Sequence, residues 1–448
     1  MLQDPPYKVF LKYALPSIFG LLSISSASII DGYFVGNYVG PTGLAAINLC
    51  SPIFAILLGF SLMFAVSHSL LISKMIGENN VTEARNIFTK SLVLTCIFSF
   101  SLSALVYFNI SNIFGFFSIK GELNTWAHQY LSILLMFVPY FMIGVVIDYF
   151  VRADESPILS FLALFLSSAI NIGLDYLFIV KYNYGISGAA YATGASQALI
   201  MVFLIPHFFH SKSRLRLMKP IGSFFNVIVA LKNGISELIN ECSGGVIVMI
   251  FNYIMLKDSG AEGVAAYTIV SYFILINLML SFAISDGLQP ILAQHLGAKK
   301  QDRITSFLKL GFTTILGFSL LLIISVLLYS EPLTNLFIDE SQTLATKDIA
   351  IDFLKYTWCA FIFSGNNILI TSYLTSMQKA FQSGLISLLR GLVLPLVLVI
   401  SLYNTMGIIG VYITLPISEF LTFLVAFSFF KKSQSRVYTD LPSSSCNQ

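Results

Sequence analysis

Long runs of apolar residues, separated by short polar stretches, recur along the whole of this 448-residue chain. As a helix, a run of about 20 apolar residues is long enough to cross the hydrocarbon core of a bilayer. The pattern predicts twelve membrane-spanning helices, at residues 10–37, 44–73, 87–110, 126–150, 157–180, 186–210, 224–256, 262–295, 304–329, 350–377, 382–402 and 408–430. The expected fold class is therefore all-α, a polytopic membrane protein.

The first half of the chain is repeated in the second at a constant offset. The segment Gly40 to Ala46 (GPTGLAA) recurs as Gly260 to Ala266 (GAEGVAA), and the basic loop at Gly77 recurs equally far on (260 − 40 = 297 − 77 = 220). Two halves of like topology are the usual skeleton of a secondary transporter. We therefore expect two pseudo-symmetric six-helix bundles, an N-terminal one at residues 1–215 and a C-terminal one at residues 216–448.

Composition and charge narrow the class further. With 56% hydrophobic residues, 10% charged residues and a mean hydropathy of +0.82, the chain cannot form a polar-coated soluble domain. Lys and Arg gather near both ends and in the loops after even-numbered segments, most densely in the linker at residues 212–232. The positive-inside rule then places both termini in the cytoplasm, and we expect a plasma-membrane protein.

Motifs of enzymes and pumps are missing from the sequence. It has no Walker A sequence and no Ser/His/Asp constellation, and its five cysteines lack metal-like spacing. We expect no enzyme activity and no cofactor. Transport energy would then come from an ion gradient, with H⁺ or Na⁺ as the coupling ion.

Several short strings in both halves carry a resemblance to a known family. They are Ile30 to Gly36 (IDGYFVG), Gly43 to Ala46 (GLAA), Asn171 with Asp175, Gly185 to Thr193, and Gly287 to Pro290 (GLQP). In this order they resemble the multidrug and toxic compound extrusion (MATE) family. The resemblance implies twelve helices in two bundles and export of organic, often cationic, compounds against entry of H⁺ or Na⁺.

The resemblance also implies a cation-coupling site in the N-terminal half. Its residue types stand here at Asp31, Asn171, Asp175 and Thr193. Independently, Asp31, Asp175 and Thr193 lie roughly 7–11 Å below the outer ends of their predicted helices, so one shared site is feasible. Carboxylate, amide and hydroxyl groups suit a proton or a hard cation, and all four residues would be metal ligands if the ion is Na⁺. Neither acid has an acidic counterpart in the other half.

A second set of residues is a candidate for substrate binding. A charged side chain in the hydrocarbon core of a membrane costs free energy, so an acidic residue within a membrane helix is a candidate functional residue. Glu237 and Glu241 share a helix face, and Asp286 lies in the next helix. These acids could bind a cationic substrate or a second ion. The aromatic and flexible side chains that could line a cavity beside them are Tyr33, Tyr140 and Met279.

A flippase for lipids or lipid-linked saccharides is the main rival function. Flippases of the same superfamily commonly need a basic cavity for pyrophosphate. The intramembrane charges here are instead mostly acidic, at Asp31, Asp148, Asp175, Glu237, Glu241, Asp286 and Glu419 against Arg390, which we expect to pair with an acid or snorkel. That balance favours an organic cation or amphipathic small molecule as substrate. We expect no nucleic-acid partner, contact with membrane lipids, and a monomer.

Overall fold

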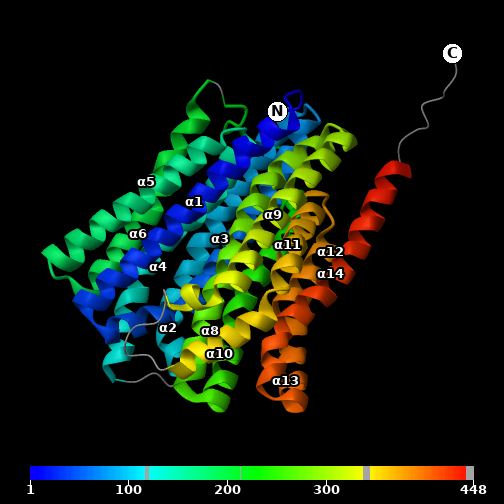
Figure 1. Cartoon of the computed structure of the whole chain (residues 1–448). Coiled ribbons are helices and arrows are strands. Elements are labelled where there is room, and N and C mark those ends of the chain that lie inside the picture. The colour runs from blue at the N-terminus through cyan, green and yellow to red at the C-terminus, as the bar shows by residue number, and fades with distance from the viewer. Residues whose placement is uncertain (117–120, 212, 336–343, 440–448) are drawn as a thin grey trace. The chain divides into compact units, whose positions relative to one another are not determined.

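The computed structural model describes residues 1–116, 121–211, 213–335 and 344–439 (Figure 1). These residues divide into two compact units. Unit 1 comprises Met1–Glu241 and Ala293–Ala298, and unit 2 comprises Cys242–Leu292 and the chain from Lys299 onward. Each unit is built from helices, and the described residues contain no strand.

Unit 1 holds the first six membrane-crossing helices and the linker that follows them. Its elements are α1 (Pro6–Phe34), the π-helical turn η1 (Val35–Val39), α2 (Pro41–Gly77), α3 (Val81–Phe116), α4 (Gly121–Ala153), α5 (Pro157–Asp175), the π-helical turn η2 (Tyr176–Lys181), α6 (Gly185–Leu204), the 3-10 turn η3 (Ile205–Phe209), α7 (Phe225–Ala230) and the 3-10 turn η4 (Leu231–Gly234). Helix α4 packs on α2, α3 and α6, and α1 packs along α5.

Unit 2 holds the remaining helices. They are α8 (Ile235–Gly297), whose two ends belong to unit 1, α9 (Gln301–Asn335), α10 (Leu344–Thr357), α11 (Ala360–Ser376), α12 (Ala380–Leu388), the π-helical turn η5 (Leu389–Val393), α13 (Leu394–Met406) and α14 (Ile408–Thr439). Helix α14 packs on α11 and α13. The rings of Phe251, Tyr267, Phe353 and Tyr412 stack in succession in its core.

Each of the twelve predicted segments contains helix, which confirms the all-α, twelve-helix membrane fold. Helix α8 supplies two crossings, because Gly260 breaks it with a φ of 64° and a ψ of −153°. Two segments differ in detail from the prediction. The stretch 350–377 is two helices, α10 and α11, with a break at Trp358 and Cys359. The stretch 224–256 begins with α7 and η4, and Gly234 at the end of η4 lies against α2, where a Cβ would be 2.2 Å from the Met63 carbonyl oxygen.

The repeated glycines have the same structural role in both halves. Gly40 precedes α2 with a φ of 98°, and Gly260 occupies the matching turn, in a region of φ that favours glycine. Gly77 and Gly297 end their helices in close backbone contact within unit 1. A Cβ on Gly77 would lie 2.0 Å from the Gln294 carbonyl oxygen, and one on Gly297 would lie 2.1 Å from that of Lys74. The sequence repeat therefore reflects repeated local geometry.

Candidate cation-coupling site

The structure brings together the four residues of the predicted N-terminal site. Asp31 lies on α1 about two turns before the π-helical end at Val39. Asp175 closes α5, directly before the π-helical turn η2, and Thr193 lies about two turns into α6. The carboxyl groups of Asp31 and Asp175 adjoin each other inside unit 1. Helices far apart in sequence thus deliver two acids to one place.

Polar atoms at this site are buried without regular hydrogen bonds. Asp175 has no exposed surface and Asn171 only 8%. Among the residues that the structure describes, no side chain or backbone group makes a hydrogen bond of regular geometry to Asp31 Oδ1, to either carboxyl oxygen of Asp175, to Asn171 Nδ2 or to Thr193 Oγ1. Buried polar groups normally have partners, because leaving one unsatisfied costs about 1–3 kcal/mol. The unpartnered oxygens of Asp31, Asp175 and Thr193 are therefore suited to a proton or a cation as the missing partner, whereas Asn171 Nδ2 is a donor that requires an acceptor.

Tyr130 is a member of this cluster that the sequence did not single out. It lies on α4, is almost fully buried, and faces Asp31, Asp175 and Thr193. Cys50 of α2 is buried beside it, with its thiol directed at the Ala127 carbonyl oxygen at 3.6 Å. The chain has 21 Tyr residues and no motif surrounds this one, so only helix packing identifies it.

The donor set fits a monovalent cation or a proton better than a transition metal. No group of three or more His, Cys, Asp and Glu side chains that could hold a metal occurs in the described part of the chain. A cation here would depend on the amide of Asn171 and the hydroxyl of Thr193 in addition to the two carboxylates. Hard cations prefer such oxygen ligands.

Two π-helical turns lie beside the acids. Turn η1 begins four residues after Asp31, and turn η2 begins immediately after Asp175. Such turns insert an extra residue into a helix and are frequent at functional sites. A third π-helical turn, η5, carries Arg390 in unit 2. All π-helical turns of the described residues thus accompany a charged side chain within a membrane helix.

The predicted substrate-binding residues are distributed over both units. Glu237 and Glu241 lie in unit 1, where the Glu241 side chain packs beside Gly59 of α2. Asp286 lies in unit 2 and accepts a hydrogen bond from Gln289 Nε2 at 3.4 Å. Tyr33 and Tyr140 are exposed in unit 1, and Met279 is half-buried in unit 2.

Other intramembrane charges are paired. Arg390 donates from Nε to Glu419 Oε1 at 3.0 Å, as expected, and Asn367 Nδ2 donates to Glu419 Oε2 at 2.8 Å. In unit 1, Asp148 accepts hydrogen bonds from Arg152 and Ser160. Both arginines are therefore neutralised by a neighbouring carboxylate.

Comparison with known proteins identifies the family. The sequence profile of MatE matches residues 16–177 and 238–401, which together are most of the chain. The chain belongs to the MatE family. It is 24% identical over 430 residues to the multidrug export protein MepA of Staphylococcus haemolyticus, covering 94% of this chain and 93% of the relative. MepA of Staphylococcus aureus strain MSSA476 is 22% identical over 440 residues, covering 95% and 93%.

Solved structures share the fold. A MOP superfamily transporter from Pyrococcus furiosus superposes with a TM-score of 0.90 at 20% identity, covering 98% of both chains. The Vibrio cholerae MATE transporter VcmN, as a mutant, gives a TM-score of 0.90 at 20% identity, covering 97% of this chain and 99% of that one. The MATE resemblance inferred from short motifs is confirmed by these matches.

Proposed function

We propose that this protein is a secondary active multidrug exporter, which moves organic cations or amphipathic toxins out of the cell against entry of H⁺ or Na⁺. Its membership of the MatE family and its similarity to multidrug export proteins along nearly their whole length support a transporter rather than an enzyme. The observation that carries the coupling proposal is the pair of adjoining buried carboxyls, Asp31 and Asp175, with unpartnered oxygens.

In the proposed mechanism, the incoming ion binds between Asp31 and Asp175. Two close carboxylates repel each other, so a proton or cation stabilises the pair. Asn171 and Thr193 supply further oxygen atoms, and Tyr130, which faces both acids, adds a phenolic hydroxyl to the site. Binding would then change the end of α1, where η1 follows Asp31 and Gly32 has no atom within 4 Å of where a Cβ would stand. Bending the helix at this point therefore costs little free energy.

The paired arginines speak against the rival flippase function. A pyrophosphate group needs positive side chains that are available to it, and Arg390 and Arg152 are instead held by Glu419 and Asp148. The comparisons with multidrug export proteins favour the exporter as well. We further propose that acids outside the coupling site, Glu237, Glu241 and Asp286, attract cationic substrates.

Topology and assembly complete the proposal. The distribution of Lys and Arg supports cytoplasmic termini in the plasma membrane. We propose that the two six-helix repeats, at residues 1–215 and 216–448, alternate between inward and outward access, and that the protein works as a monomer.

Dye efflux from proteoliposomes tests the proposed function. The purified protein is reconstituted with an organic cation dye inside, and an H⁺ or a Na⁺ gradient is imposed separately. We expect efflux to require one of these gradients. Efflux of a lipid-linked sugar, with no movement of dye under either gradient, would support the flippase instead.

A further inference from the structure

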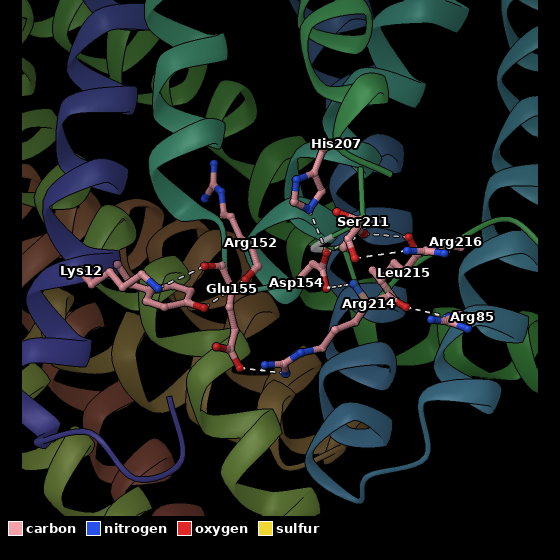
Figure 2. Close-up of polar contacts among 12 residues, drawn as sticks. Lys12, Arg85, Arg152, Asp154, Glu155, His207, Ser211, Arg214, Leu215 and Arg216 are labelled. Carbon is pink, nitrogen blue, oxygen red and sulfur yellow. Dashed lines mark hydrogen bonds and ion pairs between the residues drawn. The ribbon is translucent and has the colours of Figure 1, made fainter. Parts of the chain in front are cut away.

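The start of the linker between the repeats is fastened to the inner end of unit 1 by Asp154 and Glu155. Asp154 accepts hydrogen bonds from His207 Nε2 at 2.8 Å, from Ser213 Oγ at 2.8 Å and from the Arg214 backbone N–H at 3.1 Å (Figure 2). Glu155 pairs with the Arg214 guanidinium at 2.9 Å. One of these contacts uses the linker backbone and three use side chains, and together they fix where the linker begins.

Helix α3 holds the next part of the linker in the same way. Arg85 Nε donates to the Arg214 carbonyl oxygen at 2.7 Å, and Asn86 exchanges two hydrogen bonds with the backbone of Ile221, at 2.9 and 3.1 Å. Lys90 Nζ donates to the Ser223 carbonyl oxygen at 2.8 Å. Because α3 engages the linker backbone, several linker side chains are left to project away from the bundle.

The projecting side chains are of two kinds, large apolar and basic. Leu217, Ile221 and Phe225 are 57%, 60% and 67% exposed. Arg216 directly precedes Leu217, Lys219 lies between Leu217 and Ile221, and both basic side chains are also exposed. The Arg216 guanidinium donates to the Ser211 carbonyl oxygen at 3.2 Å. Interleaved apolar and basic side chains are typical of segments that lie in a membrane interface.

The depth of the linker agrees with an interface. Helix α3 has 36 residues, which at ~1.5 Å per residue make about 54 Å, so it extends roughly 12 Å beyond a core of about 30 Å at each end. Arg85 to Lys90 lie about 6–13 Å from its inner end at Val81. The linker segment that they hold therefore runs at the boundary between headgroups and hydrocarbon.

We propose that residues 214–228 of the linker form a binding surface for anionic phospholipid of the inner leaflet. Leu217, Ile221 and Phe225 enter the acyl region, while Arg216 and Lys219 bind the headgroup phosphate. A lipid of this kind presents apolar chains and negative charge together, which matches both kinds of projecting side chain. The inference requires that the helices span a membrane but not that the protein exports drugs, so the two can fail separately.

Native mass spectrometry of the full chain tests this surface. The protein is titrated in detergent with phosphatidylglycerol and, separately, with phosphatidylcholine. We expect tighter retention of phosphatidylglycerol, and a loss of about 30-fold in its apparent affinity for the double variant Arg216→Gln/Lys219→Gln, at about fivefold for each basic side chain. The matched control Lys8→Gln/Lys309→Gln removes the same charge from exposed sites outside the linker and should bind as the parent does. Equal retention of both lipids, or an unchanged double variant, would overturn the proposal.

Two further measurements identify the source of the phosphate and the position of the apolar side chains. Inorganic phosphate at millimolar concentration should not displace the lipid; displacement would show a site for free phosphate instead. In a Trp126→Phe/Trp358→Phe background, Ile221→Trp should be quenched by lipids brominated on their acyl chains. A tryptophan at this position that remains accessible to a water-soluble quencher, and is not quenched by brominated lipid, would contradict insertion.

Discussion

The buried ion pair of unit 2 joins Arg390 to Glu419, and the substitution Arg390→Met removes its positive member while keeping a long apolar side chain. The two side chains are only 10% and 12% exposed, and the Nε to Oε1 distance is 3.0 Å. Removing one partner of a buried pair costs about 3–5 kcal/mol, because the remaining charge is left uncompensated. Asn367 still donates to Glu419 in the variant. We therefore expect the free energy of unfolding to fall by about 3 kcal/mol, near the lower end of this range.

A double-mutant cycle separates the contribution of this pair from that of ordinary packing. Glu419→Gln alone should also lower the free energy of unfolding. The double variant Arg390→Met/Glu419→Gln retains neither charge, so its loss of stability should be smaller than the sum of the losses in the two single variants.

The assay is unfolding in mixed micelles with increasing sodium dodecyl sulfate, followed by helix content at pH 7. Lys309→Met is a control, because this exposed base on α9 should change stability by no more than about 0.5 kcal/mol. Losses of stability in the two single variants that simply add up in the double variant would refute the ion-pair reasoning.

Three other predictions follow from the site, the substrate acids and the linker. Asp31→Asn and Asp175→Asn should each abolish gradient-driven dye efflux while leaving membrane insertion and helix content intact, as measured by efflux and circular dichroism; coupled efflux by both variants would contradict the site. Glu241→Gln or Asp286→Asn should weaken binding of a cationic dye far more than that of a neutral one in fluorescence titrations, and equal losses would indicate a structural role. Asp154→Asn weakens the hydrogen bonds that hold the start of the linker and should lower the free energy of unfolding by about 1–3 kcal/mol; chemical denaturation measures it, and an unchanged protein would contradict the anchoring role.

Hydrophobic pattern and repeated motifs predict most of this fold. Each apolar run is helical because a membrane leaves the backbone no other way to satisfy its hydrogen bonds. The repeat correctly identified Gly40 and Gly260 as equivalent turns, since both require backbone angles that suit glycine. The break at Trp358 and Cys359 has neither Gly nor Pro to signal it, so the sequence could not show it.

The candidate site was only partly accessible from the sequence. Depth along the helices placed Asp31 and Asp175 at the same level, but contact between them also depends on how each helix is rotated, which packing decides. Tyr130 and the π-helical turns were missed for this reason. The partner of Arg390 could be expected to be an acid, but its identity as Glu419 depends on the packing of η5 against α14.

The most direct test of the central claim is efflux of a cationic dye from proteoliposomes carrying the parent or Asp175→Asn, with an H⁺ or a Na⁺ gradient imposed alone. We expect one of these gradients to drive efflux by the parent and neither to drive efflux by the variant. Gradient-driven efflux by Asp175→Asn equal to that of the parent would contradict it.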